Sequence, residues 1–319
     1  HIMLRFEQII KMALKSIPFI FSTTGFEITA KNHHPKQVSS VRANRRDCWK
    51  SNRRTVISLI PSTFLLPWIG PVEHFASAAS SEDFVKEEVR KVVSKSKAPG
   101  VLRLAFHDAG TFDINNSSGG MNGSVIYELD RPENIGLKKP VKILKKAKEE
   151  IDAKQAISWA DLIAVAGAEA VALCGGPIIS IPMGRLDYGA SDSEGKLPEE
   201  SLKAAALKES FLSKGFSTRE LVALSGAHTI GGKGFGSATV FDNSYYKILL
   251  EKPWASADGM KSMIGLPSDH ALVEDDECLR WVKLYATDQT MFFHDFSHAY
   301  IKLVNSTATW KHSSPPYLS

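Results

Sequence analysis

Apolar residues recur at helical spacing through most of the chain beyond residue 80. In Phe84–Ser94 they follow a period close to 3.6 residues, and in Pro140–Ile151 they alternate with lysines at the same period, so both segments are predicted to be amphipathic helices. Strand signals are few, and Ile178–Met183 is the best of them. The pattern predicts a mostly helical protein, with further helices over 101–109, 158–173, 217–228, 243–250, 276–286 and 289–304.

Local signals define where two of these helices begin. Ser158-Trp-Ala-Asp161 and Ser217-Thr-Arg-Glu220 both place an acidic residue three positions after a serine, which is the pattern of a capped helix start. Gly175-Gly-Pro177 is expected to end the first of the two. The loop 184–196 is expected to join two halves of one body, about 79–190 and 191–319.

Charge is distributed unevenly along the 319 residues. The net charge is +4, but the first 78 residues hold 11 basic and 4 acidic side chains, whereas the remainder holds 28 basic and 31 acidic ones. The body is therefore mildly acidic, and nothing in it suggests a nucleic-acid partner. A hydrophobic content of 43% is ordinary for a soluble globular protein. Of three cysteines, Cys174 and Cys278 lie in the body, where two buried thiols are expected rather than a pair.

Two histidine segments carry the candidate chemistry. In LRLAFHDAGT, Leu102–Thr111, Arg103 and His107 are four residues apart and share one helix face. A cation and an imidazole on one face can stabilise an anion and shuttle a proton at the same point. In LVALSGAHTIG, Leu221–Gly231, His228 ends a predicted helix. One histidine could act as acid and base while the other holds a metal centre.

These segments resemble the distal and proximal helices of class I plant haem peroxidases of the ascorbate peroxidase type. GLPSDHAL, Gly265–Leu272, resembles the segment that holds the partner of the proximal histidine, and ISWADLIAVAGAEAV and VFDNSYYKILL match further landmarks in order. The resemblance runs from about Glu82 to Trp310, and its closest pattern is that of thylakoid-lumen members. It implies an all-α fold whose distal and proximal halves enclose haem b.

On the distal side, the resemblance assigns Arg103, His107 and Asn134 to the catalytic positions. His107 would take a proton from hydrogen peroxide and return it to the departing oxygen, while Arg103 would stabilise the developing charge. Asn134 would accept from the far ring nitrogen of His107, and Glu128 matches an acid behind it. Phe106 stands against the haem where class I members usually carry tryptophan.

On the proximal side, the resemblance makes His228 the axial iron ligand and Asp269 its hydrogen-bond partner. The loop after His228 is shorter than the family pattern, which there carries a propionate contact, the ascorbate-binding arginine and a tryptophan beneath the haem. Gly234 stands at the propionate position, no arginine follows it in the loop before Phe241, and Trp254 lies too far along the chain to replace the tryptophan.

Two functions remain open at this point. One is a haem peroxidase that reduces hydrogen peroxide with a small donor in oxidative-stress defence, with ascorbate the least supported donor. The other is a haem-poor pseudoenzyme with a structural or interaction role in the thylakoid lumen, including peripheral contact with membrane complexes. The distal and proximal residues favour the first function, and the shortened loop favours the second.

The N-terminal region, 1–78, reads as a two-part targeting sequence. Its first fifty or so residues are basic and poor in acidic side chains, as in organellar transit peptides. Arg53-Arg54 then precedes the apolar run Val56–Gly70, and Ala76-Ser-Ala78 offers a cleavage site. We expect import into the chloroplast and then the thylakoid lumen, with a membrane anchor or a buried helix as the alternative. Met3 or Met12 is the expected initiator.

Two further motifs could be functional sites but are also explained by ordinary solvated helix faces. His294-Asp-Phe-Ser-His298 has the i, i+4 histidine spacing of zinc sites, although a solvated histidine face on an ordinary helix explains it too. The lysine-rich run 138–148 is expected to be a solvated face rather than a partner site.

Overall fold

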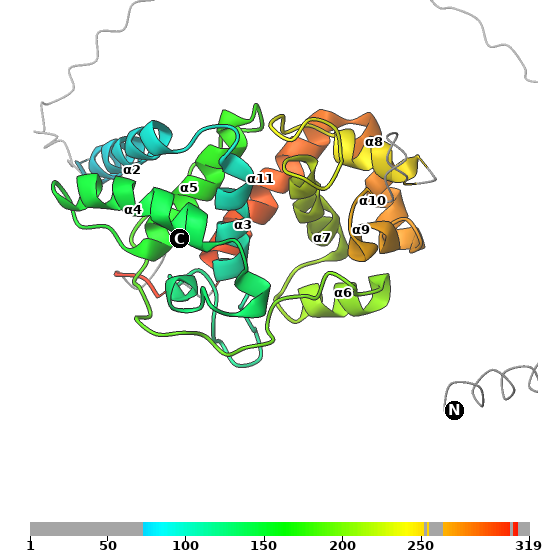
Figure 1. Cartoon of the computed structure of the whole chain (residues 1–319), viewed down its shortest axis with the longest axis horizontal. Coiled ribbons are helices and arrows are strands. Elements are labelled where there is room, and N and C mark those ends of the chain that lie inside the picture. The colour runs from blue at the N-terminus through cyan, green and yellow to red at the C-terminus, as the bar shows by residue number, and fades with distance from the viewer. Residues whose placement is uncertain (1–72, 252–253, 255–263, 307–308, 312–319) are drawn as a thin grey trace, which may run out of the picture. The chain divides into compact units, whose positions relative to one another are not determined.

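The computed structural model describes residues 73–251, 254, 264–306 and 309–311. This part of the chain is helical and contains only two isolated β-bridges, Asp113–Ser118 and Arg185–Trp310, so the predicted all-α class is confirmed. The α-helices are α2 Glu73–Val92, α3 Ala98–Ala109, α4 Lys138–Asp152, α5 Trp159–Leu173, α6 Ala204–Leu212, α7 Thr218–Ser225, α8 Ser244–Leu250, α9 Pro267–Ala271, α10 Asp276–Thr287 and α11 Gln289–Asn305 (Figure 1). Three short 3-10 turns are η1 Ser124–Tyr127, η2 Pro132–Asn134 and η3 Gly226–Thr229.

The predicted helix starts at Ser158 and Ser217 are confirmed. The Ser158 hydroxyl accepts the backbone N–H of Asp161 at 3.0 Å, which satisfies an N–H at the start of α5. At α7, Ser217 accepts the N–H of Glu220, and the Glu220 carboxylate accepts the N–H of Ser217 at 2.8 Å. This reciprocal pair closes the capping box that the sequence indicated.

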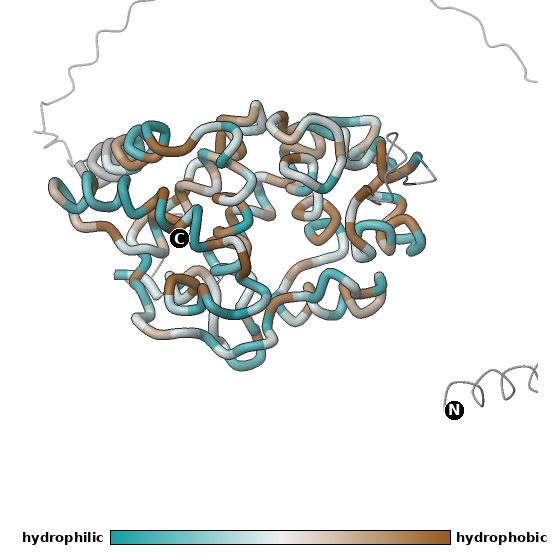
Figure 2. The backbone as a smooth tube through the Cα atoms, viewed as in Figure 1, coloured by the Kyte–Doolittle hydropathy of each residue, from teal (hydrophilic) through white to brown (hydrophobic). Residues whose placement is uncertain are grey.

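Helix α5 lies at the centre of the hydrophobic core. All of its residues from Ala160 to Val171 are buried, and α3 packs along it with Val101 and Leu104 fully enclosed. Gly167 of α5 is required here, because a side-chain carbon at this position would come within 2.8 Å of Ala105 on α3. In Figure 2 the outer helix α4 instead alternates hydrophilic and hydrophobic residues, as an amphipathic surface helix should.

The core divides into two groups of helices that share α11. Helices α2 to α5 pack together on one side, and α7, α8 and α10 pack together on the other (Figure 1). Helix α11 contacts both α7 and α3. It is also bonded to α5, because the Tyr300 hydroxyl donates to the carbonyl of Ala164 at 2.8 Å. This arrangement places the segments that contain His107 and His228 within one framework.

The strand prediction for Ile178–Met183 is wrong. This segment is irregular, and side-chain carboxylates rather than a neighbouring strand satisfy its backbone. Glu82 accepts the N–H of Ile181 at 2.7 Å, and Asp161 accepts the N–H groups of Gly184 and Arg185 just beyond the segment. The apolar alternation is real, since Ile179 and Ile181 are buried, but it marks an extended chain laid on the helices.

The observed helices differ from the predicted ones in several places: α3 begins at Ala98 rather than Val101, and the predicted helix 217–228 is α7 followed by the 3-10 turn η3. Helix α2 begins at Glu73 rather than near Phe84 and therefore includes 76–78, the proposed cleavage site. The sequence missed α6, which buries only Leu207 and Phe211, and α9, which is too short to show a period.

Three further predictions concern the two cysteines, a membrane-spanning helix and the targeting region. Cys174 and Cys278 are buried free thiols, as expected. No helix among the described residues is long and apolar enough to cross a membrane. The apolar run Val56–Gly70 and the remainder of the targeting region up to residue 72 lie outside the described residues.

Candidate active site

Helix α3 presents Arg103 and His107 on the face opposite its buried one. Val101, Leu104 and Ala105 pack into the core with no exposed surface, whereas Arg103 and His107 keep partial exposure. The i, i+4 spacing therefore places both side chains on the same side of the helix, as the sequence predicted.

Hydrogen bonding fixes the tautomer of His107. Its Nδ1 lies 2.8 Å from Oδ1 of Asn134, which is buried in η2. The amide nitrogen of Asn134 donates to the backbone carbonyl of Glu128 at 3.0 Å, so the amide oxygen must face the imidazole. The proton of neutral His107 therefore lies on Nδ1, and Nε2 carries a free lone pair.

Burial and a neighbouring cation keep His107 neutral. Burial, together with the positive charge of Arg103, lowers the pKa of His107 to about 4. The hydrogen bond to Asn134 opposes this shift without cancelling it. The imidazole can accordingly accept a proton at neutral pH and over a wide range below it.

Arg103 is held by the same turn that positions Asn134. Its guanidinium donates to the backbone carbonyls of Glu133 and Ile135, both at 2.8 Å. Burial lowers the pKa of Arg103 and the charge of Glu200 acts against that shift, but a guanidinium stays protonated in proteins. The distal cation is thus tied to η2, beside His107.

Glu128 and Phe106, the other two predicted distal residues, contact the site in different ways. The carboxylate of Glu128 accepts from Arg131 at 2.9 Å and from the N–H of Asp192 at 2.6 Å, so only its backbone carbonyl supports Asn134. Phe106 packs edge-on to His107, with centroids 6.2 Å apart, and stacks on Phe211 of α6 at 6.5 Å. Phe106 therefore connects the distal helix to α6.

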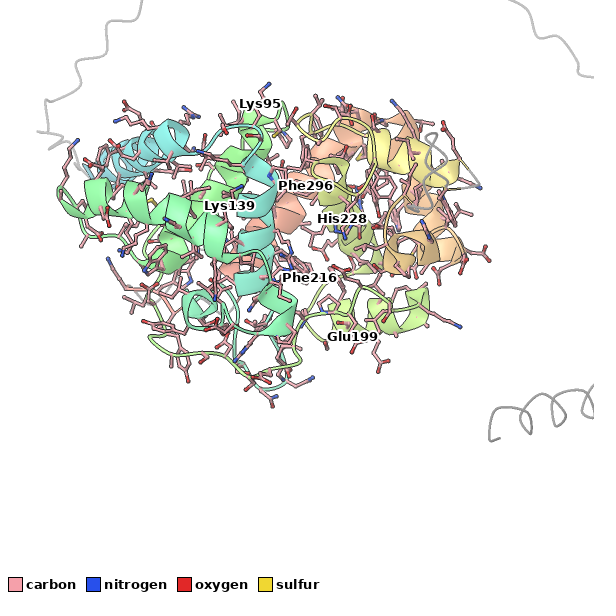
Figure 3. The ribbon with its side chains drawn as sticks, viewed as in Figure 1. Lys95, Lys139, Glu199, Phe216, His228 and Phe296 are labelled. Carbon is pink, nitrogen blue, oxygen red and sulfur yellow. The ribbon has the colours of Figure 1, made fainter. Side chains whose placement is uncertain are left out.

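The proximal side begins where α7 tightens into η3, which ends just after His228 (Figure 3). His228 Nδ1 lies 2.7 Å from Oδ1 of Asp269, a buried residue on α9. Asp269 Oδ2 accepts the backbone N–H of Leu266 at 2.8 Å. The carboxylate therefore receives donors on both oxygens and orients the imidazole with Nε2 pointing away from it.

The contact between His228 and Asp269 shifts the pKa of both side chains. Burial alone would raise the pKa of Asp269, but the donors from His228 and Leu266 hold it below its ordinary value. Partial enclosure by its neighbours would lower the pKa of His228, and the Asp269 carboxylate reverses that shift so that the pKa is raised. Asp269 is thus an anion that strengthens the electron-donating character of the imidazole.

Tyr245 is a member of this cluster that the sequence did not single out. Its hydroxyl donates to Asp269 Oδ1 at 2.8 Å, the same oxygen that accepts from His228. The side chain is fully buried, and burial raises the pKa of Tyr245 well above its ordinary value, so it remains a donor. The only sequence signal was its position inside the FDNSYY landmark, which says nothing about where the hydroxyl points.

The shortened loop after His228 folds back on itself. The N–H of Gly231 donates to the carbonyl of Ala238 at 2.9 Å, and Phe235 is buried edge-on against Tyr245 with centroids 4.6 Å apart. Gly234 has φ of +88°, and a side-chain carbon there would press on Ile264, so glycine is favoured at this position. An aromatic ring from the loop thus lies beside the proximal cluster.

Trp254 contacts His270 and Leu249. It stacks on His270 with centroids 3.9 Å apart and donates its indole N–H to the carbonyl of Leu249 at 3.0 Å. Tyr245 rather than an indole therefore provides the second side-chain donor to Asp269.

A pair of opposite charges lies near both histidine segments. Lys233 Nζ is 3.9 Å from the carboxylate of the exposed Glu200. The backbone carbonyl of Glu200 accepts the N–H of Ser268 beside Asp269 at 3.0 Å, and the charge of Glu200 acts to raise the pKa of both Arg103 and His228.

The residues present fit a haem better than a bare metal ion. No described residue donates to or accepts from His228 Nε2, and the side chain remains 37% exposed although Asp269 and Tyr245 beside it are buried. The described part of the chain contains no group of three or more His, Cys, Asp or Glu side chains that could hold a metal. A single oriented imidazole suits an iron whose other ligands come from a porphyrin.

Comparison with known proteins shows the family to which this chain belongs. The family model described as "Peroxidase" matches residues 81–288. "Putative L-ascorbate peroxidase 6" of Arabidopsis thaliana is 62% identical over 260 residues, which covers 82% of this chain and 78% of that protein. "L-ascorbate peroxidase 2, cytosolic" of Arabidopsis thaliana is 37% identical over 69% of this chain and 93% of its own length. "Putative heme-binding peroxidase" of Pyricularia oryzae is 34% identical over 72% of this chain and 88% of its own length.

Proposed function

Since this chain belongs to the peroxidase family, we propose that it reduces hydrogen peroxide with His107 as its proton-transferring base. Haem is the cofactor of this family, and the relatives support a haem peroxidase-like function rather than the haem-poor structural alternative. The observation that carries the proposal is the fixed tautomer of His107, which leaves the lone pair of Nε2 free. The pKa of His107, lowered to about 4, keeps the ring neutral so that Nε2 can accept a proton.

The distal residues divide the work of proton transfer. His107 Nε2 accepts one proton from hydrogen peroxide and returns it to the oxygen that departs as water. Asn134 keeps the other ring proton on Nδ1, so Nε2 is free for each cycle. Arg103, held on η2 at 2.8 Å from two carbonyls, provides a fixed positive charge beside the departing oxygen.

The proximal residues would hold the cofactor. His228 would be the axial ligand, and Asp269 and Tyr245 would set its orientation and its donor strength. Haem, when bound, supplies the iron and the electrons for cleavage of the O–O bond. A stopped-flow measurement of peroxide reduction by haem-loaded protein tests the proposal, and the absence of any reaction above that of free haemin would contradict it.

We propose further that the electron donor is a small phenol rather than ascorbate. Several relatives are named for ascorbate, but this chain has no arginine in the loop 229–240 after His228, and the one lysine of that loop, Lys233, lies 3.9 Å from the carboxylate of Glu200. A charge-assisted contact to an anion is worth roughly 1.5–3 kcal/mol, or about ten- to a hundredfold in affinity. Steady-state kinetics should show guaiacol saturating while ascorbate turnover stays slow and rises linearly with concentration.

The variant Glu200→Gln sharpens this donor test. Removing the negative charge should raise ascorbate turnover more than guaiacol turnover at low ionic strength, because only ascorbate is an anion. Added salt should shrink the difference between variant and unmodified protein. Saturable ascorbate turnover that exceeds guaiacol turnover in the unmodified protein would overturn the proposed donor and show that another residue binds the anion.

We also propose that residues 1–78 direct the protein to the chloroplast and then to the thylakoid lumen. The support is the order of a basic segment, Arg53-Arg54, the apolar run and the small residues at 76–78. The mature chain, 79–319, should then begin near Ala79, which removes the first turns of α2. N-terminal sequencing of the protein from isolated thylakoid lumen checks this, and a retained apolar run would contradict it.

A further inference from the structure

Helix α11 carries a pair of histidines that peroxide reduction does not use. His294 and His298 are both exposed, and their i, i+4 spacing places them on one face of the helix. Their ring centroids lie 4.2 Å apart. Two imidazoles this close, on a rigid helix and open to solvent, form a preorganised pair of nitrogen ligands.

Both rings are already oriented in the manner of metal ligands. His298 Nδ1 lies 2.8 Å from the backbone carbonyl of His294, and His294 Nδ1 lies 3.2 Å from the carboxylate of Asp295. Since both acceptors are oxygens, each neutral ring carries its proton on Nδ1. Metal-binding histidines nearly always donate this second ring N–H to a carboxylate or a carbonyl, which leaves Nε2 for the metal.

The carboxylate behind His294 is itself fixed. Asp295 accepts from Arg219 Nε at 2.7 Å and Nη2 at 2.8 Å, and from the hydroxyl of Tyr285 at 2.6 Å. His294 is therefore braced by an anion that is tied to α7 and α10.

We propose that His294 and His298 together bind one divalent transition-metal ion, such as Zn²⁺, Ni²⁺ or Cu²⁺, through their Nε2 atoms. Imidazole nitrogen suits these ions, and water molecules would complete the coordination shell because the pair provides only two protein ligands. The described residues show no hydrogen bond to either Nε2, so the metal displaces no protein partner.

This site binds a metal ion without hydrolytic chemistry. In the zinc-protease pattern H-E-x-x-H, the acidic residue after the first histidine acts as a base on metal-bound water. Here Asp295 occupies that position, but Arg219 and Tyr285 engage its carboxylate on the buried side of α11. The site therefore differs from a metalloprotease centre and is separate from His228.

Calorimetric titration of the full-length, untagged, haem-loaded protein with ZnCl₂ or NiCl₂ tests the site. The experiment should show binding of one ion, and His294→Asn and His298→Asn should each weaken it by roughly tenfold or more, because the second ligand acts at high effective concentration. Thr290→Asn on the same helix is the matched control, and its affinity should equal that of the unmodified protein. Metal should also raise the melting temperature, and this rise should disappear in both histidine variants.

Cu²⁺ provides a readout that does not depend on stability. The electron paramagnetic resonance spectrum of one bound Cu²⁺ should show coupling to two equivalent imidazole nitrogens, reduced to one nitrogen in either variant. Equal metal affinity of the unmodified protein and both histidine variants would overturn the proposal, because the ion would then bind elsewhere. Absence of binding at millimolar metal would overturn it too, and would identify the pair as an ordinary solvated helix face.

Discussion

Haem-loaded protein carrying His107→Leu should react with hydrogen peroxide about 10² to 10⁴ times more slowly than the unmodified protein. The substitution removes the Nε2 lone pair that Asn134 keeps free, and the described distal residues include no second neutral imidazole beside Arg103. Stopped-flow measurement of the reaction with peroxide gives the rate. The Soret band should remain, because the proposed axial ligand is His228 and not His107.

The pH dependence of the same rate identifies the group responsible. Because His107 has a pKa lowered to about 4, its neutral form persists as the pH falls from neutrality, and the rate should drop only near pH 4. The His107→Leu variant should lack this acidic limb, and added imidazole should restore part of its rate. A rate unchanged by the substitution would show that another group transfers the proton.

Asn134→Ala separates the tautomer from the imidazole itself. This variant keeps His107 but removes the acceptor that holds the proton on Nδ1, so both tautomers become accessible. Its rate should fall between those of the unmodified protein and His107→Leu.

The second large effect is expected at His228. His228→Ala should abolish the Soret band at equimolar haemin, because His228 is the described histidine that Asp269 orients, whereas the neighbouring His270 is engaged by the Ile264 carbonyl and stacks on Trp254. His107→Ala should keep the band. Absorption titration with haemin measures both, and circular dichroism confirms that the helices are intact. Equal haem retention by the two variants would exclude His228 as the axial ligand.

Asp269 and Tyr245 provide graded versions of this experiment. Asp269→Asn removes the anion that orients His228, and loss of such an outer partner typically weakens metal binding by about ten- to a hundredfold. Tyr245→Phe removes only one of three donors to Asp269 and should keep nearly all the haem. The expected order of haem affinity is therefore unmodified protein, Tyr245→Phe, Asp269→Asn and then His228→Ala.

Local sequence information was sufficient wherever neighbours in the chain are also neighbours in space. The serine caps at Ser158 and Ser217 bond to N–H groups three residues away, so their patterns were decisive. The same holds for Arg103 and His107, because helical spacing alone places them on one face of α3. Motif order along the chain also paired Asn134 with His107 and Asp269 with His228, through resemblance to known peroxidases.

Contacts between distant segments were beyond the reach of these patterns. The apolar alternation at Ile178–Met183 could not reveal that Glu82, far away on α2, would satisfy the backbone in place of a strand. Nor could spacing show that the carboxylate of Glu128 turns to Arg131 while its carbonyl supports Asn134.

The sequence by itself determined the helical class, the two histidine segments and the family, because periodicity, caps and motifs are local. Only the tertiary structure decided the second donor to Asp269, since the direction of the Tyr245 hydroxyl depends on how α8 packs against α9 and η3. It likewise decided that Arg103 donates to the carbonyls of Glu133 and Ile135 and that the carbonyl of Glu200 accepts the N–H of Ser268. Side-chain direction and charge proximity arise from packing between elements far apart in the chain, and a one-dimensional pattern contains no record of them.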